Sequence, residues 1–208
     1  MTSETPVTAP RLPSPGGAVR AVIDVGTNSV KLLIAEVLGE TVRPLHETSQ
    51  VTRLGRGFYE TRLLQPKAIA DTAEVVGGFA RTALQHGAAS LRIIATSAAR
   101  DAHNAADLVA ALRDASGVAV EIISGEQEAD WVFRGVASGP LMAGHPLLIM
   151  DVGGGSTEFI VGEHGHLQFR GSFQLGVVRL LETLRPGDPP TTADLAACRR
   201  ELRAFMAA

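Results

Sequence analysis

Two short segments of the chain carry the residues best suited to phosphate chemistry. Residues 24–29 read DVGTNS and residues 151–157 read DVGGGST. In each segment an aspartate follows an apolar run and precedes a series of small residues. A turn of this composition leaves backbone N–H groups free to bind an anion such as phosphate. The carboxylate beside the turn can hold a divalent cation, directly or through water.

The repetition decides between two interpretations of these aspartates. Asp24 and Asp151 each end a strand that we expect to be buried, where a carboxylate is costly unless it is paired or bound to metal. A single aspartate at such a place more often caps its own turn. Two at matched positions favour the functional interpretation. We therefore expect two strand–turn–strand hairpins that face each other and hold one phosphate and its metal from both sides.

The small residues of both turns are the candidate phosphate ligands. Glycines there can serve as turn formers. Three in succession after a buried strand exceed what a hairpin needs, and they permit the close approach of a phosphate. The neighbouring hydroxyl and amide side chains would add hydrogen-bond donors. The predicted phosphate-binding residues are Gly26, Thr27, Asn28, Ser29, Gly153, Gly154, Gly155, Ser156 and Thr157.

Composition excludes several other classes of protein. The 208 residues suffice for one large domain or two small ones, and a net charge of −3 argues against a general nucleic-acid binder. The single cysteine, Cys198, cannot form an intramolecular disulfide, and no Cys/His spacing suggests a zinc site. The longest apolar runs are too short to span a bilayer. Because the N-terminus also lacks an apolar signal-peptide core, we expect a cytoplasmic protein with no membrane partner.

Apolar periodicity predicts which elements position these residues. The first part reads as three strands, a helix, a strand, a helix and a strand, followed by a helix that a capping box at Ser124 opens. Asn104 is predicted to cap the second of these helices and Gly117 to end it. The second part reads as three strands and two helices. We expect a disordered tail over residues 1–17, a first lobe over 18–124 and a second lobe over 125–208. The second lobe lacks at least a strand–helix–strand relative to the first.

The element order and the paired turns resemble a known α/β fold. It is the duplicated ribonuclease-H-like fold of actin, hexokinase and acetate kinase, which implies two actin-like lobes with mixed sheets, the second of them incomplete. Residues 22–29 and 151–158 resemble the two phosphate motifs of the exopolyphosphatase and guanosine pentaphosphate phosphohydrolase family. Residues 95–100, 122–129 and 174–180 are similar to further family segments, in the family's order. Family members continue beyond this point through the rest of the second lobe.

The resemblance assigns roles that the residues alone leave open. It implies that Arg100 contacts the phosphate, although a single arginine is usually a solvated surface residue. It also implies that Glu128 orients the attacking water; Glu126 is an equally ordinary acidic residue at a helix N-terminus, so only the resemblance selects Glu128. Glu158 faces either the cleft or solvent, and the resemblance favours the cleft, as a second catalytic carboxylate or a metal ligand. The implied metal set is Asp24, Asp151 and Glu158, holding Mg²⁺ or Mn²⁺.

The predicted function is a metal-dependent exopolyphosphatase that releases terminal phosphate from inorganic polyphosphate. Guanosine pentaphosphate is the alternative substrate, because both molecules end in the same phosphoanhydride. One further alternative is a non-catalytic remnant that binds phosphate or a nucleotide. Another is a kinase of the wider superfamily, which is disfavoured because the nucleotide-contacting half of the second lobe is missing. No nucleic-acid partner is expected, and a homodimer stays open as the oligomeric state.

Overall fold

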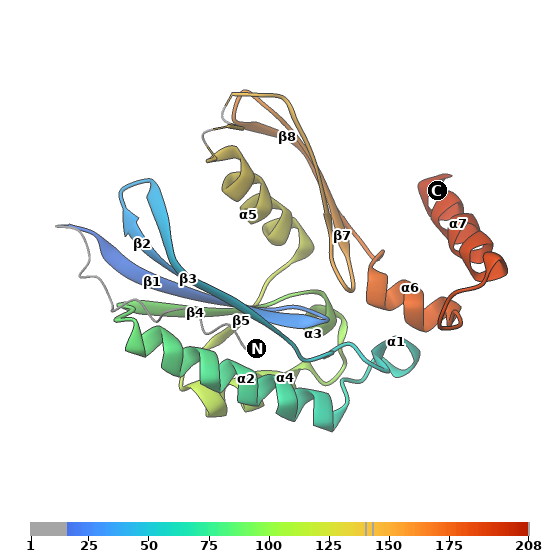
Figure 1. Ribbon diagram of the computed structural model, residues 1–208, viewed down its shortest axis with the longest axis horizontal. Helices are drawn as coiled ribbons and strands as arrows, with labels where there is room; N and C mark the ends of the chain where they lie inside the picture. The colour runs from blue at the N-terminus through green and yellow to red at the C-terminus, as the bar shows by residue number, and fades with distance from the viewer. Residues whose placement is uncertain (1–15, 140, 143, 208) are drawn as a thin grey trace, which may run out of the picture.

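The computed structural model describes residues 16–139, 141, 142 and 144–207 (Figure 1). The predicted disordered tail therefore lies outside the described residues, except for Gly16 and Gly17. Among the described residues, no helix is both long and apolar enough to cross a membrane.

The first sheet has five strands in the order β3-β2-β1-β4-β5. Strands β1 (Ala18–Val25), β2 (Ser29–Leu38) and β3 (Thr41–Val51) form an antiparallel meander. Strand β4 (Ser90–Ala95) pairs in parallel with β1, and β5 (Val120–Ile122) pairs in parallel with β4. The parallel pairs need crossover connections, which the intervening helices provide. Strand β1 is therefore central, and its last residues lie deep in the lobe.

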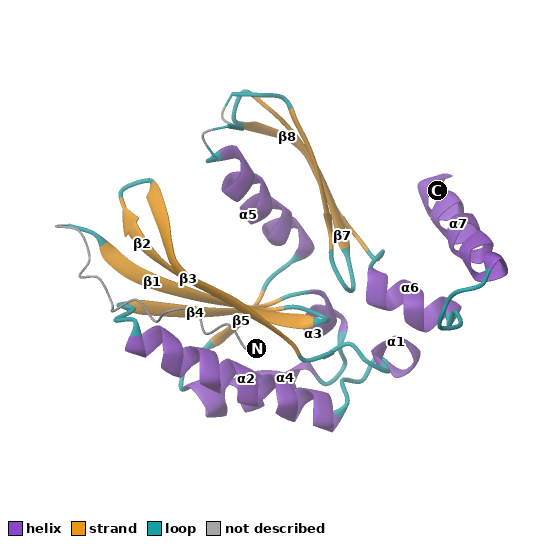
Figure 2. Ribbon diagram, viewed as in Figure 1, coloured by secondary structure: helices purple, strands orange, loops and turns teal. Residues whose placement is uncertain are grey.

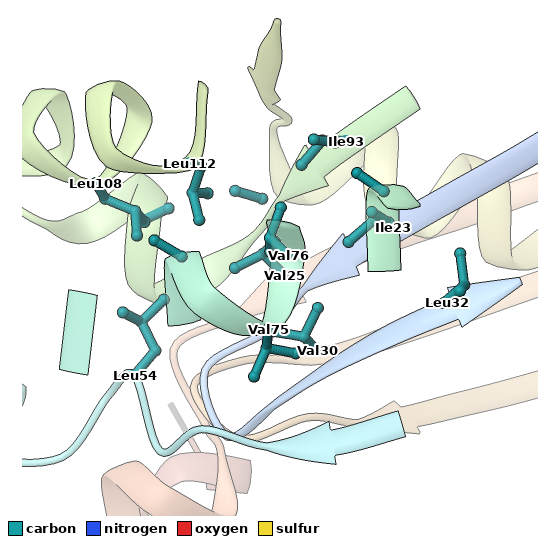
Figure 3. Packing of buried hydrophobic residues seen from close by; sticks show 14 of the residues in the cluster. Ile23, Val25, Val30, Leu32, Leu54, Val75, Val76, Ile93, Leu108 and Leu112 are labelled. Carbon is teal, nitrogen blue, oxygen red and sulfur yellow. The ribbon is translucent and has the colours of Figure 1, made fainter. Parts of the chain in front are cut away.

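Two helices cover one face of this sheet, as Figure 2 shows. Helix α2 (Pro66–Gln85) begins with a proline in its first turn, and α4 (Ala105–Ser116) ends at Gly117 in the left-handed conformation. Alternate residues of β1 and β2 point at these helices, so Ile23 and Val30 pack with Val76 in the core (Figure 3). This packing fixes the C-terminal end of β1, where Asp24 lies.

Asn104 stands at the N-cap position of α4, as predicted, but its side chain makes no capping hydrogen bond to that helix. Its amide instead accepts from the backbone N–H of Leu64 at 2.8 Å and donates to the Leu64 carbonyl at 3.0 Å. An asparagine amide can satisfy a donor and an acceptor of one distant residue, and here this pairing displaces the local cap.

The second sheet is smaller, with three antiparallel strands in the order β6-β7-β8. They are β6 (Leu147–Val152), β7 (Thr157–Glu163) and β8 (His166–Phe173). Helix α5 (Gly125–Ala137) packs on one face, where Ala129 and Phe133 meet Ile160. Helices α6 (Val177–Leu184) and α7 (Thr192–Ala207) follow. In the described chain no strand pairs with the free edge of β6, whereas β4 occupies the corresponding edge of β1.

Much of the opposite face of the second sheet is exposed, although Phe173 at its edge packs on Phe205 of α7, with ring centroids 5.7 Å apart. Leu148, Met150 and Val152 of β6 are 78%, 60% and 50% exposed. Aligning Asp151 with Asp24 matches them to Ala21, Ile23 and Val25 of β1, which lie under α2 and α4 and are at most 2% exposed. The second lobe thus repeats the hairpin of the first without its covering layer.

Two short helices were missed by the periodicity. They are α1 (Phe58–Thr61) and α3 (Ser97–Asp101), in segments where only a connection was expected. Neither is long enough to show a helical repeat of apolar residues. Both lie beside the turns that carry the candidate phosphate ligands, so they bear directly on the site.

Candidate active site

The two candidate turns have the same backbone geometry. In the first, the N–H of Gly26 donates to the carbonyl of Ser29 at 3.0 Å; in the second, the N–H of Gly153 donates to the carbonyl of Ser156 at 2.9 Å. Asp24 and Asp151 precede their turns at matched positions of β1 and β6. The internal repeat seen in the sequence is therefore a repeat of structure.

The turns face each other and touch, as the sequence predicted. A Cβ atom added to Gly154 would lie 3.0 Å from the Cβ of Thr27. One added to Gly155 would lie 2.8 Å from the Thr27 hydroxyl and 2.6 Å from the Tyr59 hydroxyl, and would also strike the hydroxyl of Ser97. Gly153, Gly154 and Gly155 do not adopt positive φ. The triple glycine is therefore needed for close approach of the first lobe, rather than for an unusual turn conformation.

Carboxylates gather beside these turns. Burial raises the pKa of Asp24; the charge of Lys31 opposes the rise, and that of Asp151 adds to it. The Asp24 Oδ1 atom is buried and has no hydrogen-bond partner. Burial also raises the pKa of Glu158, against the hydrogen bonds from Ser172 and Ser156. Packing thus holds several carboxylates close together at a cost that a cation could offset.

Glu158 lies inside the protein, which contradicts the solvent alternative, and its role in the cleft stays a prediction. Its side chain is 1% exposed, and it accepts a hydrogen bond of 2.6 Å from the Ser172 hydroxyl. Glu158 pairs with Asp151 across β6 and β7, so the second hairpin brings both carboxylates to the site.

Glu128 occupies the junction between the two sheets. The predicted capping box opens α5, because the Ser124 hydroxyl accepts from the N–H of Gln127 at 3.1 Å. This start places Glu128 in the first turn, 3.2 Å from Nη1 of Arg100. The same Arg100 nitrogen donates to the carbonyl of Ile123 at 3.0 Å, which anchors the guanidinium.

The surroundings of Glu128 disfavour its ionised form. Burial is the largest cause that raises the pKa of Glu128 to about 7; the charge of Glu158 adds to the rise and Arg100 opposes it. General bases work best when their pKa lies near the operating pH. Glu126, the other candidate in this segment, has a largely exposed side chain 3.2 Å from Nη2 of Arg170.

A cavity of ≈ 560 Å³ lies beside this cluster, with Arg100, Ser97 and Ser156 in its lining. Arg170 also lines it, together with the acidic side chains of Asp101 and Glu126. The arginines and hydroxyl groups can bind an anion, while the two carboxylates offset part of that positive charge. Asp24 borders a second cavity, of ≈ 880 Å³, on the β1–β2 face.

Two of the carboxylates fit a shared magnesium ion. Among the described residues, no set of three or more His, Cys, Asp or Glu side chains is arranged to hold a metal. Mg²⁺, however, is commonly held by one or two carboxylates together with substrate phosphates. Asp24 and Asp151 fit that donor set, because they repel each other and one Asp24 oxygen lacks a partner. The assignment of Glu158 as a third metal ligand stays a prediction.

Some predicted phosphate ligands are placed differently. The Thr157 hydroxyl donates to the carbonyl of Leu175 at 2.5 Å, because the segment before α6 packs close to it, and its role as a phosphate ligand stays a prediction. Asn28 is exposed, and its carbonyl accepts from the N–H groups of Thr52 and Arg53. Thr27, in contrast, is buried between the turns at 3% exposure.

Sequence reasoning missed three side chains around the second turn. Tyr59 lies on the short helix α1, which carried no pattern to reveal it. Ser97 and Arg179 lie in the family-like segments of residues 95–100 and 174–180, and the Nε of Arg179 donates to the carbonyl of Gly155 at 3.0 Å. Those two segments were the available signal, and they gave no role for either side chain.

The fold and the site together define a class of protein. A mixed sheet and an incomplete repeat of it, joined where two phosphate-type turns meet, form an α/β protein of the actin-like, duplicated ribonuclease-H-like class. A family model described as the Ppx/GppA phosphatase family matches residues 33–208. The chain belongs to this family.

Relatives and solved structures agree with this assignment. Exopolyphosphatase 2 of Mycobacterium tuberculosis is 38% identical over 192 residues, which are 88% of this chain and 60% of the relative. A guanosine-5'-triphosphate,3'-diphosphate pyrophosphatase of Vibrio cholerae is 32% identical over 162 residues, 78% of this chain and 32% of that protein. The crystal structure of an exopolyphosphatase from Cytophaga hutchinsonii superposes with a TM-score of 0.79 and 30% identity, over 85% of this chain and 56% of that one. The chain thus spans no more than three fifths of these relatives.

Proposed function

We propose that this chain carries the catalytic centre of a metal-dependent exopolyphosphatase, which releases terminal orthophosphate from inorganic polyphosphate. The observation that carries the proposal is the environment of Glu128. Its carboxylate lies 3.2 Å from Arg100 and its pKa is raised to about 7, beside two turns that suit a phosphate. The similarity to the M. tuberculosis protein named exopolyphosphatase 2 supports this choice of substrate.

Phosphoanhydride hydrolysis asks the protein mainly for positioning and charge stabilisation. The turn N–H groups and Arg100 would hold the oxygens of the terminal phosphate. Glu128, ionised above about pH 7, would orient a water and accept its proton. The water oxygen forms a bond to the terminal phosphorus as the bridging P–O bond breaks. The products are orthophosphate and a polyphosphate shorter by one unit.

Asp24 and Asp151 would hold Mg²⁺ or Mn²⁺ together with phosphate oxygens. When bound, such an ion supplies positive charge that offsets the repulsion between the phosphate and the carboxylates. Lys31 pairs across the strands with Asp24, and it offsets only part of that negative charge.

Guanosine pentaphosphate is the alternative substrate, supported by the similarity to the V. cholerae pyrophosphatase. A non-catalytic phosphate-binding role stays the second alternative. A cytoplasmic location and a homodimer stay predictions.

The metal requirement gives a direct test. Orthophosphate release from polyphosphate by the purified chain should stop in excess chelator and return when Mg²⁺ is added back, because the clustered carboxylates otherwise repel the substrate. A colorimetric phosphate assay measures both steps. Undiminished release in excess chelator would remove the metal from the proposal while leaving the hydrolase activity in place.

A further inference from the structure

The start of α6 holds the triple-glycine turn by its carbonyl groups. The N–H groups of Val177 and Val178 donate to the carbonyls of Gly153 and Gly154 at 3.0 and 2.9 Å. The Nε of Arg179 donates to the carbonyl of Gly155 at 3.0 Å. All three glycine carbonyls therefore point toward α6.

This arrangement fixes where the amides of the turn point. In a planar trans peptide, the carbonyl of one residue and the N–H of the next point in opposite directions. The N–H groups of Gly154, Gly155 and Ser156 are therefore directed away from α6. They are the groups that a bound anion would need.

Arg179 also ties this turn to the first lobe. Its Nη2 lies 2.9 Å from Oδ2 of Asp101, and its guanidinium carbon lies 4.5 Å from the centre of the Tyr59 ring. The Arg179 side chain is 14% exposed, and that of Asp101 is 15% exposed. Asp101 also lies 3.6 Å from Arg62, and Arg179 Nη1 donates to Gln174 at 3.3 Å. A planar guanidinium can make such divergent hydrogen bonds while stacking on a ring, which an ammonium group cannot do.

We propose that Arg179 is a positioning residue, which sets the orientation of the turn at residues 153–156 so that its amides face the substrate. The inference deepens the proposed function and rests on it for the identity of the ligand. Arg179 acts through the backbone of Gly155, not through contact with phosphate. Asp101 and Tyr59 hold the guanidinium in place from the first lobe.

The competing interpretation is that Arg179 is only one of several contacts that hold the α6 region against the α1 region. The Glu182 carboxylate accepts from the N–H of Gly57 at 2.6 Å, and Arg185 pairs with Glu60. The Arg185 and Glu60 side chains are 67% and 70% exposed, so this ion pair lies at the surface. Arg185→Gln is therefore a matched control, because it removes an arginine directly after the same helix that bridges to the same lobe.

The experiment compares Arg179→Gln, Arg179→Lys and Arg185→Gln in the intact chain. Amide hydrogen exchange is followed by NMR at Gly153, Val177 and Val178, and binding is measured with inorganic polyphosphate of one defined length. Arg179→Gln should speed exchange at these amides and weaken polyphosphate binding about tenfold, the scale of one hydrogen bond to a charged group. Arg179→Lys should recover part of the affinity by restoring the pair with Asp101, and Arg185→Gln should match wild type in both.

The outcomes separate the two proposals. Wild-type exchange and affinity in a folded Arg179→Gln protein would overturn the positioning role, as would an equal effect of Arg185→Gln. If Arg179→Gln does not fold, Arg179→Lys decides alone, and wild-type exchange in it would count against the proposal. If the wild-type chain binds no polyphosphate, the proposed function fails, and faster exchange in Arg179→Gln still supports positioning of the turn.

Discussion

At the scale of single residues, the site depends on how packing changes the acidity of Glu128. The first turn of α5 buries this carboxylate beside Glu158, while Arg100 is near enough to keep it partly stabilised as an anion. A carboxylate in such an environment resists ionisation, and that resistance affects stability as well as reactivity.

The pH dependence of stability follows from the sign of this shift. Below about pH 4.5 Glu128 is protonated in both states, while between about 4.5 and 7 the unfolded chain ionises first, so folding loses stability as the pH rises. Glu128→Gln cannot ionise, so it should be more stable than wild type by roughly 1–3 kcal/mol above pH 8 and about equal to it near pH 4. Urea unfolding at both pH values measures this.

Glu126→Gln is the control for that experiment, because Glu126 is exposed and pairs with Arg170 at the surface. Its effect should be within about 0.5 kcal/mol at either pH, as is usual for surface substitutions. If Glu128→Gln raised the free energy of unfolding more at pH 4 than above pH 8, the folded protein would not disfavour the ionised Glu128 carboxylate.

At the scale of elements, the site is made by two hairpins that the chain repeats. The second turn fits against Thr27, Tyr59 and Ser97 only because Gly154 and Gly155 lack side chains. The sequence analysis predicted that these glycines allow the close approach of a phosphate. The structure shows that they also allow the close approach of the first lobe.

Gly155→Ala tests that fit. The added methyl group would strike three hydroxyl-bearing side chains, so we expect about 1–3 kcal/mol of destabilisation, typical of overpacking, together with weaker polyphosphate binding. Gly135→Ala is the matched control, since a Cβ atom at this exposed position in the last turn of α5 meets nothing within 4 Å and should stabilise the helix by up to about 1 kcal/mol. Thermal unfolding and a binding titration compare the two. Equal stability of both variants would show that the turns do not pack as described.

The sequence predicted the elements better than the contacts between them. Alternating residues around Ile23 and the capping box at Ser124 are local patterns, so their strand and helix could be read directly. The pairing of Asn104 with Leu64, the bond from Thr157 to Leu175 and the place of Arg179 depend on segments that are distant in sequence or on short helices without periodicity. Such contacts exist only once the tertiary packing is formed.

At the scale of the whole molecule, the two lobes differ in what covers their sheets. The first sheet has α2 and α4 over its apolar face. The second sheet has α5 on one face (Figure 1), and its other face is contacted by α7 through Phe205 but leaves β6 largely open. Leu148 and Met150 are prominent on that open surface. Monomeric soluble proteins rarely expose large contiguous apolar patches.

The 208-residue chain should therefore bind a hydrophobic dye such as ANS and associate with itself. Leu148→Gln combined with Met150→Gln should lower both dye fluorescence and the associated fraction, because it replaces the most exposed side chains of β6. Light scattering and dye titration measure the change, and Leu84→Gln, at an exposed apolar residue of the first lobe, is the control. Undiminished self-association of the double variant would mean that the associating surface does not include Leu148 and Met150.

The most direct test of the account is orthophosphate release from polyphosphate by wild type, Glu128→Gln and Glu126→Gln. A glutamate that orients the attacking water acts mainly in the transition state, so Glu128→Gln should bind polyphosphate about as tightly as wild type and release phosphate ~10²–10⁴-fold more slowly. Glu126→Gln should be close to wild type. Loss of activity in Glu126→Gln alone would contradict the assignment, and activity in both would make Glu158 the next candidate. A wild-type chain that binds polyphosphate and never releases phosphate would contradict the hydrolase account itself and leave a binding protein.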